Sequence, residues 1–215
     1  MGSQLVKPIP ILVPDPVFPF DAIGLNLPAG RELFRVHSSS RNAHEFNPGY
    51  GAPTRFAFFG SPPVPVLYAA ETADAAIAES LLHDVPLQGG TLVPKVYRNK
   101  RMSRLFVQRE LHLASFMGNG LRRLGLAAEQ ITSTSAFHYD RTVLWASAAY
   151  AAGFDGIFYM SRQCNSDRAY VFFGNRANDA FQVDQAWHWT FDDPRGGLPE
   201  LITLCNALKV EVLVR

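Results

Sequence analysis

Four segments of the sequence carry the side chains best suited to polar chemistry. They are LFRVHS around Arg35, PTRF around Arg55, the stretch Val66–Ser80 with Tyr68 and Glu79, and FDGIFYMSR, which ends in Ser161 and Arg162. A guanidinium binds a phosphate or a carboxylate through two parallel hydrogen bonds. A carboxylate stabilises positive charge that develops in a transition state. These residue types could therefore bind an anionic ligand and stabilise a cationic centre, provided that the fold brings them together.

Other catalytic and ligand-binding motifs fit the sequence poorly. Gly118-Asn119-Gly120 begins like a dinucleotide-binding fingerprint but has Arg123 where the third glycine belongs. The chain contains no phosphate-binding P-loop, no GxSxG nucleophile elbow and no HExxH zinc motif. The six histidines never stand four residues apart, so we expect no metal centre.

The elements that hold the candidate residues can be predicted from local patterns. Leu33–His37 alternates apolar and polar residues, and Val66–Ala70 is a short apolar run, so both predict strands. Thr72 is typical of a helix N-cap, and the helix is expected to run to about Asp84. Within it Glu79 stands roughly 200° around the helix from Ile77, which places the carboxylate off the apolar face.

The remaining pattern predicts more strands than helices. We expect strands at Arg55–Phe59, Leu92–Arg98, Arg104–Val107, Leu111–Ala114, Ile157–Met160, Tyr170–Phe173 and Val210–Val214. We expect short helical turns within Leu121–Gln130, and helices at Asp140–Ala152 and Leu198–Leu208. Because strands and helices do not alternate, the pattern favours an α+β fold over a parallel doubly wound sheet.

Length and composition favour one domain. The 215 residues divide into a proline-rich arm, residues 1–30, and a body, residues 31–215. Twenty basic and 19 acidic residues give a net charge of +1, which argues against direct nucleic-acid binding. No apolar run is long enough to span a membrane, and the prolines of the arm do not suit a signal peptide, so we expect a cytoplasmic protein.

The order and spacing of the four segments resemble those of the RES domain, a family named for its Arg, Glu and Ser. The resemblance spans about residues 31–174, and the interval from Tyr68 to Glu79 is its sharpest element. It includes a connecting segment at Phe106–Leu126 and the helix sequence YDRTVLWA at Tyr139–Ala146. The resemblance implies an ADP-ribosyltransferase-like fold of mixed sheets with flanking helices.

The resemblance also implies an activity. Members of the family bind and degrade NAD, and many are toxins paired with a helix-turn-helix antitoxin. NAD is then a substrate, and no cofactor or metal is implied. The first-strand Arg35, Tyr68, Glu79 and Ser161 match the catalytic positions, and Arg35, Arg55, Tyr68 and Ser161 would bind NAD. Many members place an asparagine just before the strand that follows the serine, where this chain has Arg168 and Ala169.

The matched residues suit cleavage of the nicotinamide–ribose bond. That cleavage passes through an oxocarbenium-like centre, which the Glu79 carboxylate could stabilise. Arginines would hold the pyrophosphate, and Tyr68 could stack on nicotinamide or ribose. The acceptor could be water, as in a glycohydrolase, or phosphate, as in a phosphorylase. ADP-ribosyl transfer to a macromolecule is less favoured, because Glu71 lies eight residues before Glu79 and forms no tight pair with it. A binding module without catalysis is the third alternative.

Each candidate also has an ordinary structural interpretation. Arg35 could be an exposed strand charge and Arg55 a partner in a loop ion pair. Tyr68 could be a core aromatic residue and Ser161 a strand-end cap. Glu79 could simply be solvated on the polar face of its helix. The functional hypothesis predicts that all five residues meet at one cavity. None of the structural interpretations makes that prediction.

Overall fold

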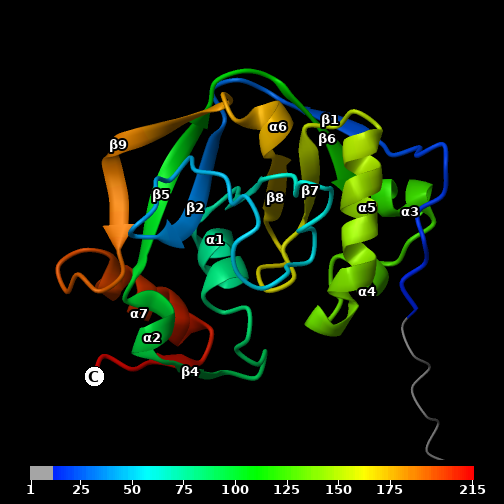
Figure 1. The fold of residues 1–215 in the computed structure, drawn as a ribbon. Coiled ribbons are helices and arrows are strands. Elements are labelled where there is room, and N and C mark those ends of the chain that lie inside the picture. The colour runs from blue at the N-terminus through cyan, green and yellow to red at the C-terminus, as the bar shows by residue number, and fades with distance from the viewer. Residues whose placement is uncertain (1–11) are drawn as a thin grey trace, which may run out of the picture.

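The computed structural model describes residues 12–215 and contains one large sheet (Figure 1). Its strands lie in the order β1-β6-β7-β8-β3-β2-β5-β9. Their bounds are β1 Gly24–Leu27, β2 Glu32–Ser38, β3 Val66–Ala70, β5 Lys100–Val107, β6 Leu111–Phe116, β7 Gly156–Met160, β8 Arg168–Phe173 and β9 Phe181–Thr190. The β6–β7 pair is parallel and the other pairs are antiparallel. The mixed sheet confirms the predicted α+β class.

Helices flank the sheet in two groups. Figure 1 shows α5 beside α3 and α4 at one end, and α1, α2 and α7 near the other. The bounds are α1 Ala73–Ser80, α2 Pro94–Tyr97, α3 Asn119–Leu124, α4 Ala128–Ile131, a 3₁₀ turn η1 Ala136–His138, α5 Tyr139–Ala151, α6 Gly174–Ala177 and α7 Gly197–Ala207. A second small sheet pairs β4 (Gly90–Leu92) with β10 (Val210–Val212) in parallel. No helix within residues 12–215 has the length and apolar character needed to cross a bilayer.

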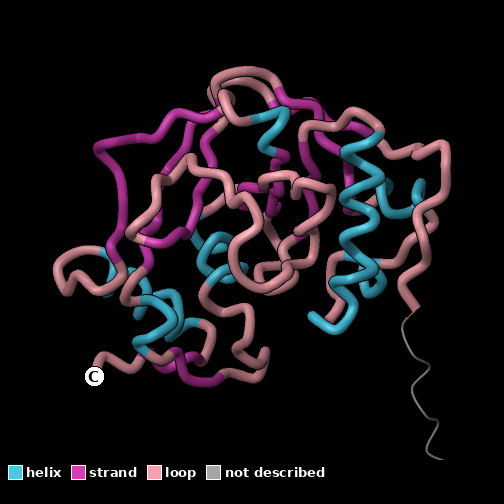
Figure 2. Tube along the Cα trace, viewed as in Figure 1, coloured by secondary structure: helices cyan, strands magenta, loops and turns pink. Residues whose placement is uncertain are grey.

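The large sheet opens between β2 and β3. These strands pair only at Phe34 and Ala70, whereas β2 and β5 stay in register from Glu32–Phe106 to Ser38–Lys100. The long loop between β2 and β3 crosses one face of the sheet at this position (Figure 2). The divergence of two neighbouring strands leaves room for a cavity near the centre of the sheet.

Apolar packing fixes the elements on either side of this opening. Trp145 of α5 and Tyr159 of β7 belong to one buried cluster. Ile77 of α1 packs in another, together with Leu201 and Cys205 of α7. The N-cap of α1 is the predicted Thr72, whose Oγ1 accepts a hydrogen bond from Ala75 N at 3.1 Å. Burial of the Ala75–Ala78 run holds α1 against the sheet and leaves Glu79 half-buried beside the opening.

The described part of the N-terminal arm lies against α5 and the sheet. The carbonyl of Pro14 accepts a hydrogen bond from Trp145 Nε1 at 2.8 Å, and Asp15 pairs with Arg141 at 2.7 Å. Farther along, β1 joins the edge of the sheet beside β6, although the sequence analysis predicted no strand there. Residues 1–11 of the arm lie outside the described part of the chain.

Two predicted strands are wrong for local reasons. The segment predicted as a strand at Arg55–Phe59 is a tight turn in which Thr54 and Ala57 exchange both backbone hydrogen bonds. The segment predicted at Leu92–Arg98 changes from strand to helix at Pro94, because proline suits the first turn of a helix and cannot continue a ladder.

The sequence analysis also missed β9, the edge strand at Phe181–Thr190. Its apolar residues Phe181, Val183, Trp187 and Trp189 do alternate, but Gln185 interrupts the pattern, and most of the strand is half-buried or exposed. A register shift between Ser103 and Leu105 in the neighbouring β5 interrupts the pairing as well. Trp187 and Trp189, two residues apart, add the aromatic content that is typical of a strand.

Candidate active site

A cavity of about 370 Å³ occupies the opening between β2 and β3. Arg35 from β2, Arg55 from the following loop, Tyr68 from β3 and Glu79 from α1 all line it. Its volume lies within the range of cavities that bind small molecules. The structure thus brings together four of the five residues that the sequence analysis selected.

Glu79 is held by three hydrogen-bond donors from the β7 end. Its Oε1 accepts from the Ser161 hydroxyl at 2.7 Å and from the Arg162 backbone N–H at 3.0 Å. Its Oε2 accepts from the Tyr159 hydroxyl at 3.3 Å. Donors on both oxygens fix the orientation of the carboxylate, so the polar face of α1 is anchored here and is not simply solvated.

The prediction that all five residues line one cavity is wrong for Ser161, which contacts Glu79 but does not line the cavity. Its side chain is fully buried, and its oxygen also accepts a hydrogen bond from Cys164 N at 3.0 Å. The residue follows the last position of β7, where its N–H bonds to the Asp167 carbonyl. The predicted contact of this hydroxyl with a ligand stays a prediction, whereas its contact with Glu79 suits a positioning role.

Arg55 is a buried cation without a carboxylate partner among residues 12–215. Its Nη2 donates to the Thr134 carbonyl at 3.2 Å, its guanidinium lies 5.6 Å from the Tyr139 ring centroid, and its Nε has no hydrogen-bond partner. A buried charge is costly unless it is paired, so an anion bound in the cavity would supply what Arg55 lacks. The alternative of a loop ion pair is not seen in this part of the chain.

Arg35 is likewise held by neutral groups. Its Nη1 donates to the carbonyls of Ala43 and Glu45 at 2.6 and 2.8 Å. Burial lowers the pKa of the Arg35 guanidinium to about 10, although the nearby Glu45 charge opposes this shift. The side chain remains protonated near neutral pH and adds a second positive charge to the cavity wall.

Three tyrosines complete the wall as neutral groups. Burial raises the pKa of Tyr68 to about 12, although hydrogen bonds with Thr54 at 2.9 Å and Phe56 N at 3.1 Å oppose the shift. Burial and then the Glu79 charge raise the pKa of Tyr159 well above its usual value. Burial also raises the pKa of Tyr139. All three hydroxyls therefore stay protonated and can donate hydrogen bonds at neutral pH.

The sequence analysis missed Tyr159 and His83, which both line the cavity. Tyr159 precedes Ser161 by two residues, so a strand ending at Ser161 would have placed both on one face. His83 lies four residues after Glu79 and bonds through Nε2 with the Tyr139 hydroxyl at 2.9 Å. Ala169, which stands near the position where the resemblance would place an asparagine, lines the cavity but has no polar side-chain atom.

No group of three or more His, Cys, Asp or Glu side chains among residues 12–215 could hold a metal ion. Both cysteines are free, with Cys205 buried and Cys164 half-buried. The polar groups that line the cavity are guanidinium, carboxylate, phenol, the His83 imidazole and the hydroxyls of Thr54 and Ser80.

Comparison with known families decides where this arrangement belongs. The family model described as the RES domain matches residues 32–192, which is most of the chain. The chain belongs to the RES domain family. No curated protein matches it. A chain of the crystal structure of the M. tuberculosis MbcT–MbcA toxin–antitoxin complex shares the fold, with a TM-score of 0.56 and 14% identity over 86% of this chain and 91% of that one.

Proposed function

We propose that this RES domain protein degrades NAD by cleaving the bond between nicotinamide and ribose. The observation that carries the proposal is the Glu79 carboxylate, held by three donors on a cavity wall that also contains Arg35 and Arg55. The two arginines, which have no carboxylate partners among residues 12–215, suit an anionic diphosphate. The fixed carboxylate suits a carbon that becomes cationic during the reaction. NAD is a substrate with both features.

In the proposed reaction the C1′–N bond breaks and its electron pair stays on the nicotinamide nitrogen. Nicotinamide leaves as a neutral molecule, so the leaving group needs no general acid. The ribose becomes oxocarbenium-like, and the Glu79 carboxylate stabilises that charge. Water or phosphate then forms the new bond to C1′, and the proton of an attacking water is released to solvent. The products are nicotinamide with ADP-ribose or with ADP-ribose-1″-phosphate.

The other groups would bind and orient the dinucleotide. Arg35 and Arg55 would hold the diphosphate, which would satisfy the unpaired Nε of Arg55. The Tyr68 ring would lie against nicotinamide or its ribose. Ser161 and Tyr159 would orient the Glu79 carboxylate toward C1′ through their hydrogen bonds to it.

We further propose that the protein acts as a toxin in the cytoplasm, with a helix-turn-helix antitoxin as its partner. Membership of the RES family supports this, since many members form such pairs. The fold shared with a chain of a toxin–antitoxin complex is compatible with it.

ADP-ribosyl transfer to a macromolecule is less well supported. Transferases of this kind use a second acidic residue paired closely with the catalytic glutamate, and the chain has no such pair, since Glu71 lies eight residues before Glu79. Asp84 does line the cavity, but its side chain is almost fully exposed and bonds to His83. In the structure Glu71 forms an ion pair with Arg31 and does not line the cavity. Hydrolysis or phosphorolysis therefore fits the site better.

The test is product analysis by mass spectrometry after incubation of the purified chain with NAD, with and without phosphate. Free ADP-ribose identifies a glycohydrolase, and ADP-ribose-1″-phosphate formed only with phosphate identifies a phosphorylase. A labelled macromolecule in an extract would favour the transferase. NAD that stays intact while it raises the melting temperature would favour a binding module and contradict the proposal.

A further inference from the structure

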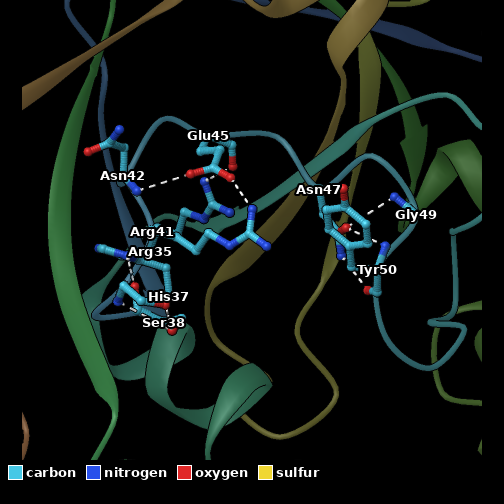
Figure 3. A network of polar contacts seen from close by, with 10 residues as sticks. Arg35, His37, Ser38, Arg41, Asn42, Glu45, Asn47, Gly49 and Tyr50 are labelled. Carbon is cyan, nitrogen blue, oxygen red and sulfur yellow. Dashed lines mark hydrogen bonds and ion pairs between the residues drawn. The ribbon is translucent and has the colours of Figure 1, made fainter.

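A second cavity of about 170 Å³ lies on the other side of Arg35. Its wall is the loop that follows β2, with Arg41, Glu45 and Tyr50 as its principal polar side chains (Figure 3). Arg35 lines both cavities, and its Nη1 donates to the backbone carbonyl of Glu45 at 2.8 Å. A ligand held at Arg35 could therefore extend into both cavities.

The charge of the second cavity does not favour an additional phosphate. Arg41 forms an ion pair with Glu45, so its positive charge is already engaged. His37 also lines the cavity, but burial lowers its pKa to about 4 and leaves the ring neutral near pH 7. Arg35 is then the one cation of this wall without a carboxylate partner among residues 12–215, and it stands at the boundary with the first cavity.

The Glu45 carboxylate is held in place yet keeps acceptor capacity. Oε1 accepts from the Arg41 guanidinium, and Oε2 accepts from Asn42 N at 3.3 Å (Figure 3). A carboxylate has about four acceptor sites on its two oxygens, so further hydrogen bonds can be accepted. Its side chain is 35% exposed, which leaves it accessible to a ligand.

Tyr50 supplies an aromatic surface next to this carboxylate. Asn47 fixes its backbone, because Asn47 Oδ1 accepts from Tyr50 N at 2.8 Å and Asn47 Nδ2 donates to Tyr50 O at 2.9 Å. The Arg41 guanidinium lies 5.3 Å from the Tyr50 ring centroid. The ring is nevertheless 63% exposed, so a planar base could pack against it.

We propose that the second cavity binds the adenosine half of the dinucleotide, and that Glu45 accepts a hydrogen bond from the adenosine ribose 2′-hydroxyl and so selects NAD over NADP. This inference rests on the proposed function, and it adds the class of dinucleotide that the site accepts. With the diphosphate at Arg35, the nicotinamide ribose lies toward Glu79 and the adenosine lies toward Tyr50.

The selectivity follows from charge. A 2′-hydroxyl donates to a carboxylate, as the acidic residue of many dinucleotide sites accepts from this group. A 2′-phosphate would bring a second anion against Glu45 and would offer no proton to it. The cation nearest to that position, Arg41, is already paired with Glu45.

The experiment compares the binding of ADP-ribose and of 2′-phospho-ADP-ribose by titration calorimetry. We expect the unmutated chain to bind ADP-ribose at least about tenfold more tightly, because 2′-phospho-ADP-ribose lacks the hydrogen bond to the charged carboxylate and adds an anion beside it. Glu45→Gln should bring the two affinities to within about threefold. Glu129→Gln, which removes the same charge from an exposed position on α4, should leave the preference unchanged.

Equal affinity of the unmutated chain for both ligands would overturn the inference, as would no binding of either. An unchanged preference in Glu45→Gln would overturn it as well. Neither ligand contains the nicotinamide–ribose bond, so their binding is measured without turnover. If NAD stays intact but ADP-ribose binds with the expected preference, the proposed reaction fails and the inference about the second cavity stands.

Discussion

The two cavities that meet at Arg35 hold their carboxylates differently. Glu79 is half-buried, and its partners are two hydroxyls and a backbone N–H, none of which is charged. Glu45 is partly exposed and forms an ion pair with the Arg41 guanidinium. A carboxylate held by neutral donors keeps its full negative charge for a cation that forms beside it, whereas an ion-paired carboxylate is suited to recognition. Under the proposed function, the first cavity would carry the reaction and the second would select the dinucleotide.

The largest effect expected from this comparison is that of Glu79→Gln. The substitution keeps the shape of the side chain and removes its charge. A unit charge a few ångströms from the developing cation, at an effective dielectric constant of about 20, corresponds to a loss of roughly 10²–10³ in kcat. NAD turnover by Glu71→Gln, whose carboxylate lies outside both cavities, should stay near that of the unmutated chain. Near-normal turnover by a folded Glu79→Gln would remove Glu79 from the mechanism.

A smaller loss is expected for Ser161→Ala. The variant lacks one of the three donors to Glu79, and a hydrogen bond to a charged group is worth about 10- to 100-fold in rate. Because Ser161 does not line the cavity, the loss should fall on kcat and leave KM unchanged. A positioning role also requires that the double variant with Glu79→Gln be no slower than Glu79→Gln alone. Additive losses would show that Ser161 acts independently of Glu79.

Arg55→Ala should affect binding more than chemistry. Arg55 lines the cavity and has no carboxylate partner in the described residues. Its positive charge would therefore attract a bound diphosphate equally in the ground state and in the transition state. We expect KM for NAD to rise about tenfold with kcat within about threefold. Arg195→Ala, at an exposed position outside both cavities, is the matched control. An unchanged KM with a collapsed kcat would instead place Arg55 at the reacting carbon.

The strands and the helix that line the first cavity could largely be predicted from the sequence. The way in which they come together to form the cavity could not. Alternation at Leu33–His37 located β2, and the Thr72 cap located the start of α1, because these signals are local. The end of α1 was wrong, since the helix stops at Ser80 and not near Asp84. The cavity itself arises where β2 and β3 diverge after one pair of residues, and pairing between distant strands has no local signal. Tyr159 was missed for the same reason, since its importance depends on where α1 brings Glu79.

The second cavity lay beyond sequence prediction. Its wall is an irregular loop without periodicity, and its shape depends on side-chain contacts such as those of Asn47 with the Tyr50 backbone. Arg55 illustrates a related failure. It was assigned to a strand, but its segment is a tight turn, and the turn brings the guanidinium into the cavity.

The smallest expected effect concerns stability and pH at the second cavity. The folded-state pKa of His37 is about 4, below the usual value of 6.5, because burial disfavours the charged ring. As pH falls from about 6.5 toward 4, the unfolded chain takes up a proton that the folded chain does not, so stability is lost over this window and is constant above it. Melting temperatures between pH 8 and pH 5 should therefore fall more steeply for the unmutated chain than for His37→Gln. Parallel curves would contradict the assignment of a neutral, buried His37.

The release of free nicotinamide from NAD by the purified chain tests the central claim most directly. We expect each NAD consumed to yield one nicotinamide and one ADP-ribosyl product with a hydroxyl or a phosphate at C1′, as measured by mass. We also expect this release to fall roughly 10²–10³-fold in Glu79→Gln at an unchanged melting temperature. Intact NAD after incubation with the folded, unmutated chain would contradict the account, and so would cleavage at any bond other than that between nicotinamide and ribose.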